Sequence, residues 1–240
     1  MAKSKKGKLI VFSGIDGSGK ATQTKLLAKR LKSKGYQIKI IDFPQYGKKS
    51  AGLVEEYLLG HYGPLDQVSP YQASIFYACD RYAASFQINR WLKKGFIVLV
   101  DRYVSANLGH QGAKIKNQKK REAFFRWVYE LEYKIFKIPK PTICFLLKTS
   151  PAISQKLIGR GYSRDKVKKR SLYLGKRKKD IHEKNFSHLE LAQKSYLHAA
   201  RFFKREFVVI ECVKDNQLLP PQEIHKMIWE KIIKRKIVNK

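Results

Sequence analysis

Short apolar runs alternate with longer amphipathic stretches along the whole chain. The short runs are rich in β-branched and aromatic residues and are bounded by Gly, Pro or charge, a pattern typical of strands buried on both faces. We expect five strands: Leu9–Ser13, Ile38–Phe43, Phe96–Val100, Thr142–Leu147 and Phe207–Glu211. The stretches between them have helical periodicity and predict helices near Lys20–Lys34, Gly52–Leu59, Pro70–Lys94, Gln118–Lys137, Pro151–Ile158, Lys184–Arg205 and Pro221–Val238.

This alternation predicts an α/β fold, a doubly wound five-stranded parallel sheet with helices on both faces. The sequence has no internal repeat and no Pro- or Ser-rich linker, so residues 1–240 are expected to form a single domain. One segment does not fit a packed core. Residues 159–179, with the sequence GRGYSRDKVKKRSLYLGKRKK, are dense in charge, and long charged insertions in compact domains are usually functional or disordered.

Composition excludes several classes of protein. A hydrophobic content of 43% argues against general disorder, and no apolar run reaches the roughly 18 to 20 residues of a membrane-spanning helix. The basic start MAKSKKGK is followed by a run too short for a secretory signal, so we expect a cytoplasmic protein. Cys79, Cys144 and Cys212 lack metal-binding spacing and are expected to be reduced thiols.

The net charge of +32 is unusual. It suggests an acidic partner such as nucleic acid or a nucleotide, or else a generally lysine-rich surface. Lysine is spread along the whole chain, which favours the second explanation. No signature of a nucleic-acid-binding motif is present, so nucleic acid is not the expected partner.

The clearest motif is GIDGSGK at residues 14–20, between the first strand and the first helix. Glycines let backbone N–H groups approach phosphate oxygens, the helix N-terminus adds a positive dipole end, and a lysine adds a point charge. The motif predicts a phosphate-binding loop that holds ATP. The expected ATP-binding residues are Gly14, Asp16, Gly17, Ser18, Gly19, Lys20, Ala21 and Thr22.

This loop departs from the usual pattern at one position. The residue after Lys20 is normally Ser or Thr, whose hydroxyl binds Mg²⁺, and here it is Ala21. Thr22 is rotated away by about 100° on a helix, so it is a poor substitute. Mg²⁺ must then be held by phosphate oxygens, waters and another acid. Otherwise the protein binds nucleotide and catalyses poorly.

Further motifs extend along nearly the whole chain: GIDGSGKATQ, DFPQYG, SPYQASIFYACDRYAA, LVDRYVSANLGHQGA, KPTICFLLKTSP and KKDIHEKN. In their order and spacing they resemble the thymidylate kinase family of P-loop nucleoside monophosphate kinases. The pair of DR motifs, with NxxxQG after the second, is the specific part. The resemblance implies a P-loop NTPase fold, transfer of a phosphoryl group from ATP to dTMP with Mg²⁺, and a homodimer.

The resemblance also implies an acceptor pocket. Asp16 matches a carboxylate that accepts the 3′-hydroxyl of the sugar, and Tyr77 matches an aromatic residue that stacks on thymine. Arg81 matches an arginine that helps to fix the base, and Arg102 one that contacts the acceptor phosphate. The full expected set for dTMP is Asp16, Phe43, Pro44, Tyr77, Arg81, Arg102, Asn107, His110 and Gln111.

The implied catalytic residues stabilise negative charge. Lys20 and Arg102 contact phosphates, and Asp101 ends a strand where an acid would position Mg²⁺ through water. The charged segment at about residues 159–180 resembles a lid that supplies an arginine to the moving phosphoryl group, because the loop position that carries this arginine in some relatives is Gly17. Arg160 and Arg164 are the expected lid residues, with Arg170 and Arg177 as alternatives.

The sequence also departs from the family pattern. Ser13 replaces a common Glu, Gln45 lies near the position of a frequent phosphate-binding arginine, and Ala106 replaces a Ser. His110 stands where a tyrosine often blocks a ribose 2′-hydroxyl. Lys148 replaces a frequent Asp at the end of the fourth strand. Together with Ala21, these departures weaken the expectation of metal binding more than that of substrate binding.

Two other functions remain open. The acceptor could be another pyrimidine monophosphate or a deoxynucleoside, since the thymine methyl group contributes only about 1–3 kcal/mol of discrimination. Alternatively, Ala21, Ser13 and the positive charge fit a catalytically weakened protein that binds nucleotides or nucleic acid.

Overall fold

The computed structural model describes residues 7–64, 67–158 and 186–238. At its centre is a five-stranded parallel sheet in the order β2-β3-β1-β4-β5. The strands are β1 (Lys8–Ser13), β2 (Ile38–Asp42), β3 (Ile97–Asp101), β4 (Ile143–Lys148) and β5 (Phe207–Glu211). All five expected strands are confirmed to within one residue at each end.

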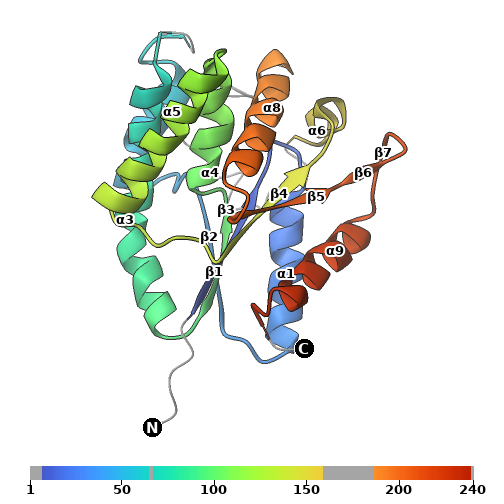
Figure 1. Ribbon diagram of the computed structural model, residues 1–240. Helices are drawn as coiled ribbons and strands as arrows, with labels where there is room; N and C mark the ends of the chain where they lie inside the picture. Colours follow the sequence, from blue (N-terminus) through green and yellow to red (C-terminus); the bar gives the residue numbers. More distant parts are fainter. Residues whose placement is uncertain (1–6, 65–66, 159–185, 239–240) are drawn as a thin grey trace.

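Helices cover both faces of this sheet (Figure 1). On one face lie α1 (Lys20–Ser33) and α9 (Pro221–Lys234), and on the other lie α3 (Pro70–Lys93), α5 (Gln118–Tyr129) and α8 (Phe186–Phe202). Alternate residues of each strand serve the two faces. In β1, Val11 packs with α3, α5 and α8, whereas Phe12 packs with α1 and α9. The expected doubly wound arrangement is therefore confirmed.

Smaller elements complete the described chain. They are α2 (Gly52–Leu59), α4 (Val104–Ala106), the π-helical η2 (Asn107–Gln111) and η4 (Glu130–Ile135), α6 (Pro151–Leu157), the 3₁₀ turns at Lys49–Ala51 and Gly112–Lys114, and the hairpin β6 (Val213–Lys214) and β7 (Gln217–Leu218). The expected helix Gln118–Lys137 is thus α5 followed by η4. No helix in the described ranges is both long and apolar enough to cross a membrane.

Several of these elements were not expected from the sequence pattern, the two 3₁₀ turns among them. The β6–β7 hairpin has two residues per strand, too few to show alternation, and it turns at Asp215 and Asn216, whose positive φ values suit a tight two-residue turn. The consecutive segments α4 and η2 were also not expected. The expected lid at about residues 159–180, with Arg160, Arg164, Arg170 and Arg177, lies outside the described residues.

The strand order indicates where on the sheet the candidate site lies. The chain leaves β1 toward the β2–β3 side of the sheet and reaches β4 on the opposite side, so the winding reverses between β3 and β1. Ligands of open parallel sheets bind beyond the carboxyl ends of the strands at such a point. Two predicted motifs meet here, because the loop 14–20 follows β1 and Arg102 follows β3.

Candidate active site

The loop 14–20 wraps closely because its glycines adopt conformations that other residues avoid. Gly14 and Gly17 have φ angles of 136° and 81°. A Cβ atom on Gly14 would lie 2.7 Å from the carbonyl oxygen of Leu147, and one on Gly17 would lie 2.0 Å from that of Ser154. A side chain at either position is excluded by both backbone conformation and space.

Lys20 lies at the centre of this loop. Its side chain is buried, and its Nζ donates to the carbonyl oxygens of Gly14 at 3.0 Å and Ile15 at 2.8 Å. The ammonium is therefore inside the curve of the backbone, where a bound phosphate would meet it. Ala21 and Thr22 follow in the first turn of α1, so the structure places the whole predicted ATP-binding stretch in one loop and helix start.

The second predicted DR motif reaches the loop directly. Arg102 has a φ of 68° and donates its backbone N–H to Phe12 of β1 at 3.0 Å. Its guanidinium Nη2 pairs with Oδ1 of Asp16. Burial alone would raise the pKa of Asp16, but the charges of Arg102 and Lys20 outweigh it and hold that pKa well below its ordinary value. The two motifs that are predicted to bind the donor and the acceptor thus lie side by side.

His110 also contacts Arg102. Nη1 of the guanidinium can only donate, so Nε2 of His110, at 2.9 Å, accepts a hydrogen bond from it. The proton of the neutral imidazole is then on Nδ1, which faces Nε2 of His188 at 3.4 Å. Burial and neighbouring cations lower the pKa of His110 well below its ordinary value and that of His188 to about 4. Both rings are neutral at physiological pH.

The first DR motif forms a buried cluster. Arg81 Nε and Nη2 donate to the two carboxylate oxygens of Glu132 at 2.5 and 2.8 Å, and both side chains are almost completely buried. Burial lowers the pKa of Arg81, but Glu132 more than offsets this and raises it. Asn107 Nδ2 joins the cluster, at 3.3 Å from Glu132 Oε1 and 3.2 Å from the carbonyl oxygen of Ser74. Arg81 and Asn107 are therefore oriented by one carboxylate.

Asp80, the other member of that motif, holds the turn after β2. One of its carboxylate oxygens accepts from the backbone N–H of Gln45 at 2.8 Å, and the other accepts from Ser50 Oγ at 2.7 Å. These bonds fix the turn that begins with Phe43 and Pro44 beside α3. Tyr77, one turn earlier on α3, is half-buried, and its ring meets Tyr57 edge-on at 6.3 Å.

The segment η2 packs tightly on α8. Ser195 Oγ donates to the carbonyl oxygen of Leu108 at 2.6 Å, and a Cβ on Gly109 would lie 2.2 Å from the ring of Tyr196. This contact fixes Asn107, His110 and Gln111 relative to the sheet. Gln111 Oε1 is buried and accepts no hydrogen bond from the described residues, so it is available to a ligand.

The donor set fits Mg²⁺ only in a limited way. In the described ranges no group of three or more His, Cys, Asp or Glu side chains is arranged to hold a metal ion. Asp101 is buried at the end of β3, next to Arg102, and supplies one carboxylate. Ser13 is hydrogen-bonded to Ser105 and receives the thiol of Cys144 at 3.4 Å. Mg²⁺ often takes one or two carboxylates and obtains its other ligands from water and phosphates, which this set permits.

Sequence reasoning missed two residues of the site. Glu132 orients Arg81 and Asn107, and His188 continues the contact from Arg102 through His110. Glu132 had a signal: it is an acid within the aromatic stretch WVYELEYKIF, and a carboxylate buried there needs a cationic partner. No signal in the sequence marked His188, because its neighbours come from distant parts of the chain.

Comparison with known proteins gives a consistent result. A family model described as thymidylate kinase matches residues 12–220. A thymidylate kinase of Mycobacterium tuberculosis is 30% identical over 147 residues, which are 61% of this chain and 68% of the relative. One of Plasmodium falciparum is 28% identical over 151 residues, 63% of this chain and 66% of the relative.

A solved structure of thymidylate kinase from Candida albicans superposes with a TM-score of 0.67. It covers 98% of this chain and 96% of that one at 20% sequence identity, so this likeness supports the fold alone. The family match spans most of the chain and includes the loop, both DR motifs and η2. The chain therefore belongs to the thymidylate kinase family of nucleoside monophosphate kinases.

Proposed function

We propose that the protein transfers the γ-phosphoryl group of ATP to dTMP, which gives ADP and dTDP. The observation that supports this most is the contact between Asp16 of the phosphate loop and Arg102 after β3. It brings the residue expected at the acceptor sugar and the residue expected at the acceptor phosphate to the edge of the ATP loop. Family membership supplies the substrate class.

The donor half of the site binds ATP through the loop 14–20. Backbone N–H groups and the start of α1 face the phosphates, and Lys20 Nζ exchanges its carbonyl partners for phosphate oxygens. Asp101 would hold Mg²⁺ through water, and the bound ion would neutralise charge on the phosphates. Ala21 has no hydroxyl to offer as a ligand, so the nucleotide and water would supply more of the coordination than in phosphate-binding loops with Ser or Thr at this position.

The acceptor half binds the nucleotide between α3 and η2. Tyr77 stacks on the base, with the Phe43–Pro44 turn beside it, and Arg81, Asn107 and Gln111 provide polar contacts at the base edge. Arg81 Nη1 makes no hydrogen bond with the described residues, so it can reach the base while Nε and Nη2 stay on Glu132. Asp16 accepts the 3′-hydroxyl.

Transfer needs no nucleophilic side chain. An oxygen of the acceptor phosphate attacks the γ-phosphorus in line, and the bond to the β–γ bridging oxygen breaks as ADP leaves. The protein aligns the two phosphates and neutralises their charge through Lys20 and Arg102. Arg102 is already oriented by Asp16 and His110 and would exchange a carboxylate oxygen for a phosphate oxygen.

A further arginine is expected from the segment that follows α6, with Arg160 and Arg164 as the proposed residues. The geometry of Gly17 supports this choice, because the carbonyl oxygen of Ser154 leaves no space for an arginine in the loop itself. The same contact sets α6 (Pro151–Leu157) against the loop, so the chain enters that segment close to the phosphates. Arg164→Ala is expected to lower kcat strongly, with little change in the affinity for dTMP.

The test of the proposal is a panel of acceptors. ADP formation is followed with ATP and Mg²⁺ in the presence of dTMP, dUMP, UMP or thymidine. We expect the highest kcat/KM with dTMP. A higher value with another acceptor would keep the kinase reaction and overturn the pocket assignment, and ATP binding without turnover of any acceptor would favour a catalytically weakened protein.

We also propose a homodimer, which an apolar stripe on α3 supports. Tyr71, Ile75, Tyr82 and Phe86 recur on one face of the helix, and all four are exposed, Phe86 by 56%. Sizing should give twice the chain mass of 27.9 kDa, and Phe86→Glu should give the monomer. A monomeric wild-type protein would remove this proposal.

A cytoplasmic location fits the cysteines. Cys79, Cys144 and Cys212 are free, and burial raises the pKa of Cys144 and of Cys212 to about 12, so both stay protonated. Reduced, unreactive thiols are typical of proteins in a reducing compartment.

A further inference from the structure

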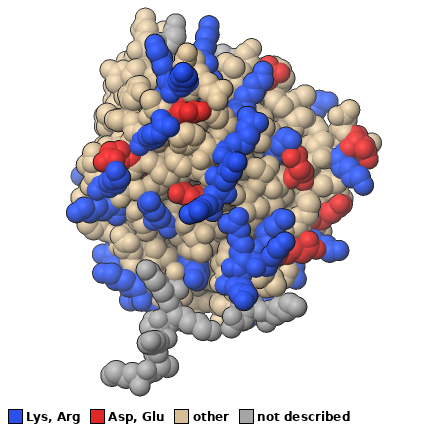
Figure 2. Space-filling model, in the orientation of Figure 1, with Lys and Arg blue, Asp and Glu red and all other residues tan. Residues whose placement is uncertain are grey.

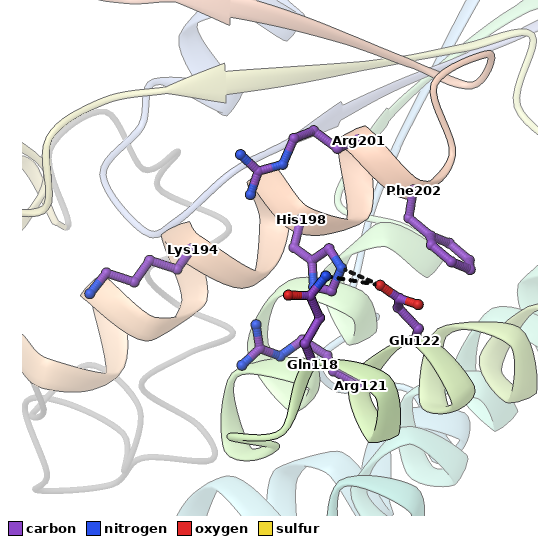
Figure 3. Close-up of a pocket in the computed structure, with 7 residues that line it drawn as sticks. All are labelled: Gln118, Arg121, Glu122, Lys194, His198, Arg201 and Phe202. Atoms are coloured by element: carbon purple, nitrogen blue, oxygen red, sulfur yellow. Dashed lines mark hydrogen bonds and ion pairs between the residues drawn. The ribbon is translucent and has the colours of Figure 1, made fainter.

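A second concave site lies away from the loop and the acceptor pocket. It is a hollow of about 530 Å³ between α5 and α8, within the size range of small-molecule sites. Figure 3 shows the residues that line it: Gln118, Arg121 and Glu122 lie on α5, and Lys194, His198, Arg201 and Phe202 lie on α8, with His198 directed toward Glu122. The proposed phosphoryl transfer uses none of these side chains.

The hollow carries an excess of positive charge. Arg121, Lys194 and Arg201 line it, and none of the three forms an ion pair with a carboxylate of the described residues. Among the described residues that line the hollow, Glu122 is the only acid. Its Oε1 accepts from Gln118 Nε2 at 3.2 Å and lies 3.1 Å from His198 Nε2, so its charge is directed to these two groups. No carboxylate in the described part of the chain therefore serves as a counter-ion to the three cations.

The start of α5 adds to this excess. A helix N-terminus is positive and is stabilised by acids, yet the first turn of α5 contains Lys119, Lys120 and Arg121 and no acid. Arg121 is held at the hollow by hydrogen bonds to the carbonyl oxygens of Ile115 at 2.9 and 2.6 Å. Local helix stability does not explain this arrangement, because the positive side chains repel the positive end of the helix dipole. A bound anion would compensate both the side-chain charges and the helix N-terminus.

The aromatic ring at the end of the hollow does not change this conclusion. Phe202 is covered by the guanidinium of Arg126 at 4.9 Å from the ring centroid, which adds a fourth cation beside the hollow and occupies a ring face that a nucleobase could use. Figure 2 shows that basic side chains far outnumber acidic ones on the face that carries α5 and α8. Recognition is therefore of phosphate rather than of a base.

We propose that the hollow between α5 and α8 binds the oligophosphate group of a small molecule, two or more linked phosphates, through Arg121, Lys194 and Arg201. Arginine and lysine at these positions give fork-shaped and point-charge donors to phosphate oxygens. A ligand with several linked phosphates carries enough charge to neutralise all three cations. The ligand is either a free inorganic oligophosphate or the phosphate tail of a nucleotide.

The test counts binding sites by calorimetry at moderate salt, with inorganic tripolyphosphate and with ATP as probes. Tripolyphosphate should occupy two sites on the wild-type protein, the loop 14–20 and the hollow. In Lys194→Gln/Arg201→Gln the second site should weaken by about 10- to 100-fold, because two charge-assisted contacts are lost. The matched control is Lys29→Gln/Lys32→Gln, which removes the same charge from exposed positions of α1 on the other face of the sheet and should keep both sites.

The arms of the experiment separate the sources of the ligand. If tripolyphosphate and ATP fill the hollow equally well, the oligophosphate alone is recognised; if both bind and ATP binds more tightly, the ligand is the phosphate tail of a nucleotide. Binding of ATP without binding of tripolyphosphate would overturn recognition through phosphate. A single site on the wild-type protein, or equal weakening in both double variants, would overturn the proposal. Tighter binding of a single-stranded oligonucleotide that depends on Lys194 and Arg201 would also overturn it, in favour of nucleic acid.

Discussion

The two clusters of charge on this molecule are organised in opposite ways. In the candidate active site the two arginines each have a carboxylate partner: Arg102 pairs with Asp16, and Arg81 with Glu132. In the hollow between α5 and α8, Arg121, Lys194 and Arg201 have none among the described residues. Both clusters are basic, but only in the first are the arginines paired with carboxylates.

The difference follows from burial. A charge removed from water is costly unless a partner and hydrogen bonds compensate it, so the buried arginines of the site are fixed in orientation by their carboxylates. An exposed cation keeps its hydration and needs no partner. Fixed orientation suits catalysis, which needs charges already in position. Hydrated, unmatched cations suit an anion that binds and leaves.

The largest expected effect is on folding. Arg81→Met leaves Glu132 buried without its partner and should destabilise the protein by about 3–5 kcal/mol in urea unfolding. Arg81→Met/Glu132→Leu should recover most of this loss, because no buried charge remains. Arg201→Met, in the hollow, should stay within about 0.5 kcal/mol of the wild type. Equal losses of unfolding free energy in Arg81→Met and Arg201→Met would contradict this difference between the two clusters.

The next effect depends on pH. The folded state lowers the pKa of His188 from 6.5 to about 4, so the unfolded chain takes up this proton first on acidification. Above about pH 6.5 the contribution of His188 to the unfolding free energy is complete. As the pH falls to about 4 this contribution is lost, and the loss amounts to about 3 kcal/mol. His188→Gln should flatten the fall in unfolding free energy over this window. Parallel profiles for the two proteins would contradict the assignment.

A smaller effect is expected at His110, which acts through Arg102. His110→Phe removes the acceptor for Arg102 Nη1 and should lower kcat/KM for dTMP about 3- to 10-fold. His225→Phe, on α9 across the sheet, is the matched control and should leave kcat/KM unchanged. If His110→Phe has no effect, Asp16 alone is sufficient to orient Arg102.

The sequence predicted the sheet well because its strands are buried on both faces and are therefore continuously apolar. It missed η2 as a helical segment, because η2 is held in place by residues far along the chain. Ser195, which donates to the carbonyl oxygen of Leu108, is 87 residues away in sequence, and Gly109 packs on the neighbouring Tyr196. The expected helix Gln118–Lys137 was correct in extent to within two residues, but its change to π-helical winding at Glu130 left no mark in the apolar pattern.

The site was predictable where chemistry is local. The loop 14–20 needs glycines and a lysine at fixed spacing, and both are visible in the chain. The pairing of Arg81 with Glu132 was not predictable. The sequence indicated that Glu132 needs a cation, but Arg81 is 51 residues away and meets it only because η4 packs on α3. The hollow was missed for the same reason: Arg121 and Arg201 meet only when α5 and α8 pack together.

The most direct test of the account compares Arg102→Lys with Arg201→Lys in the transfer of phosphate from ATP to dTMP. Arg102→Lys keeps the charge but loses the planar fork that Asp16 and His110 orient, so kcat/KM for dTMP should fall about 10- to 100-fold. Arg201→Lys should leave it within about twofold of the wild type, since an exposed side chain of the hollow takes no part in transfer. Wild-type kcat/KM in Arg102→Lys, or an equal loss in both variants, would contradict the account.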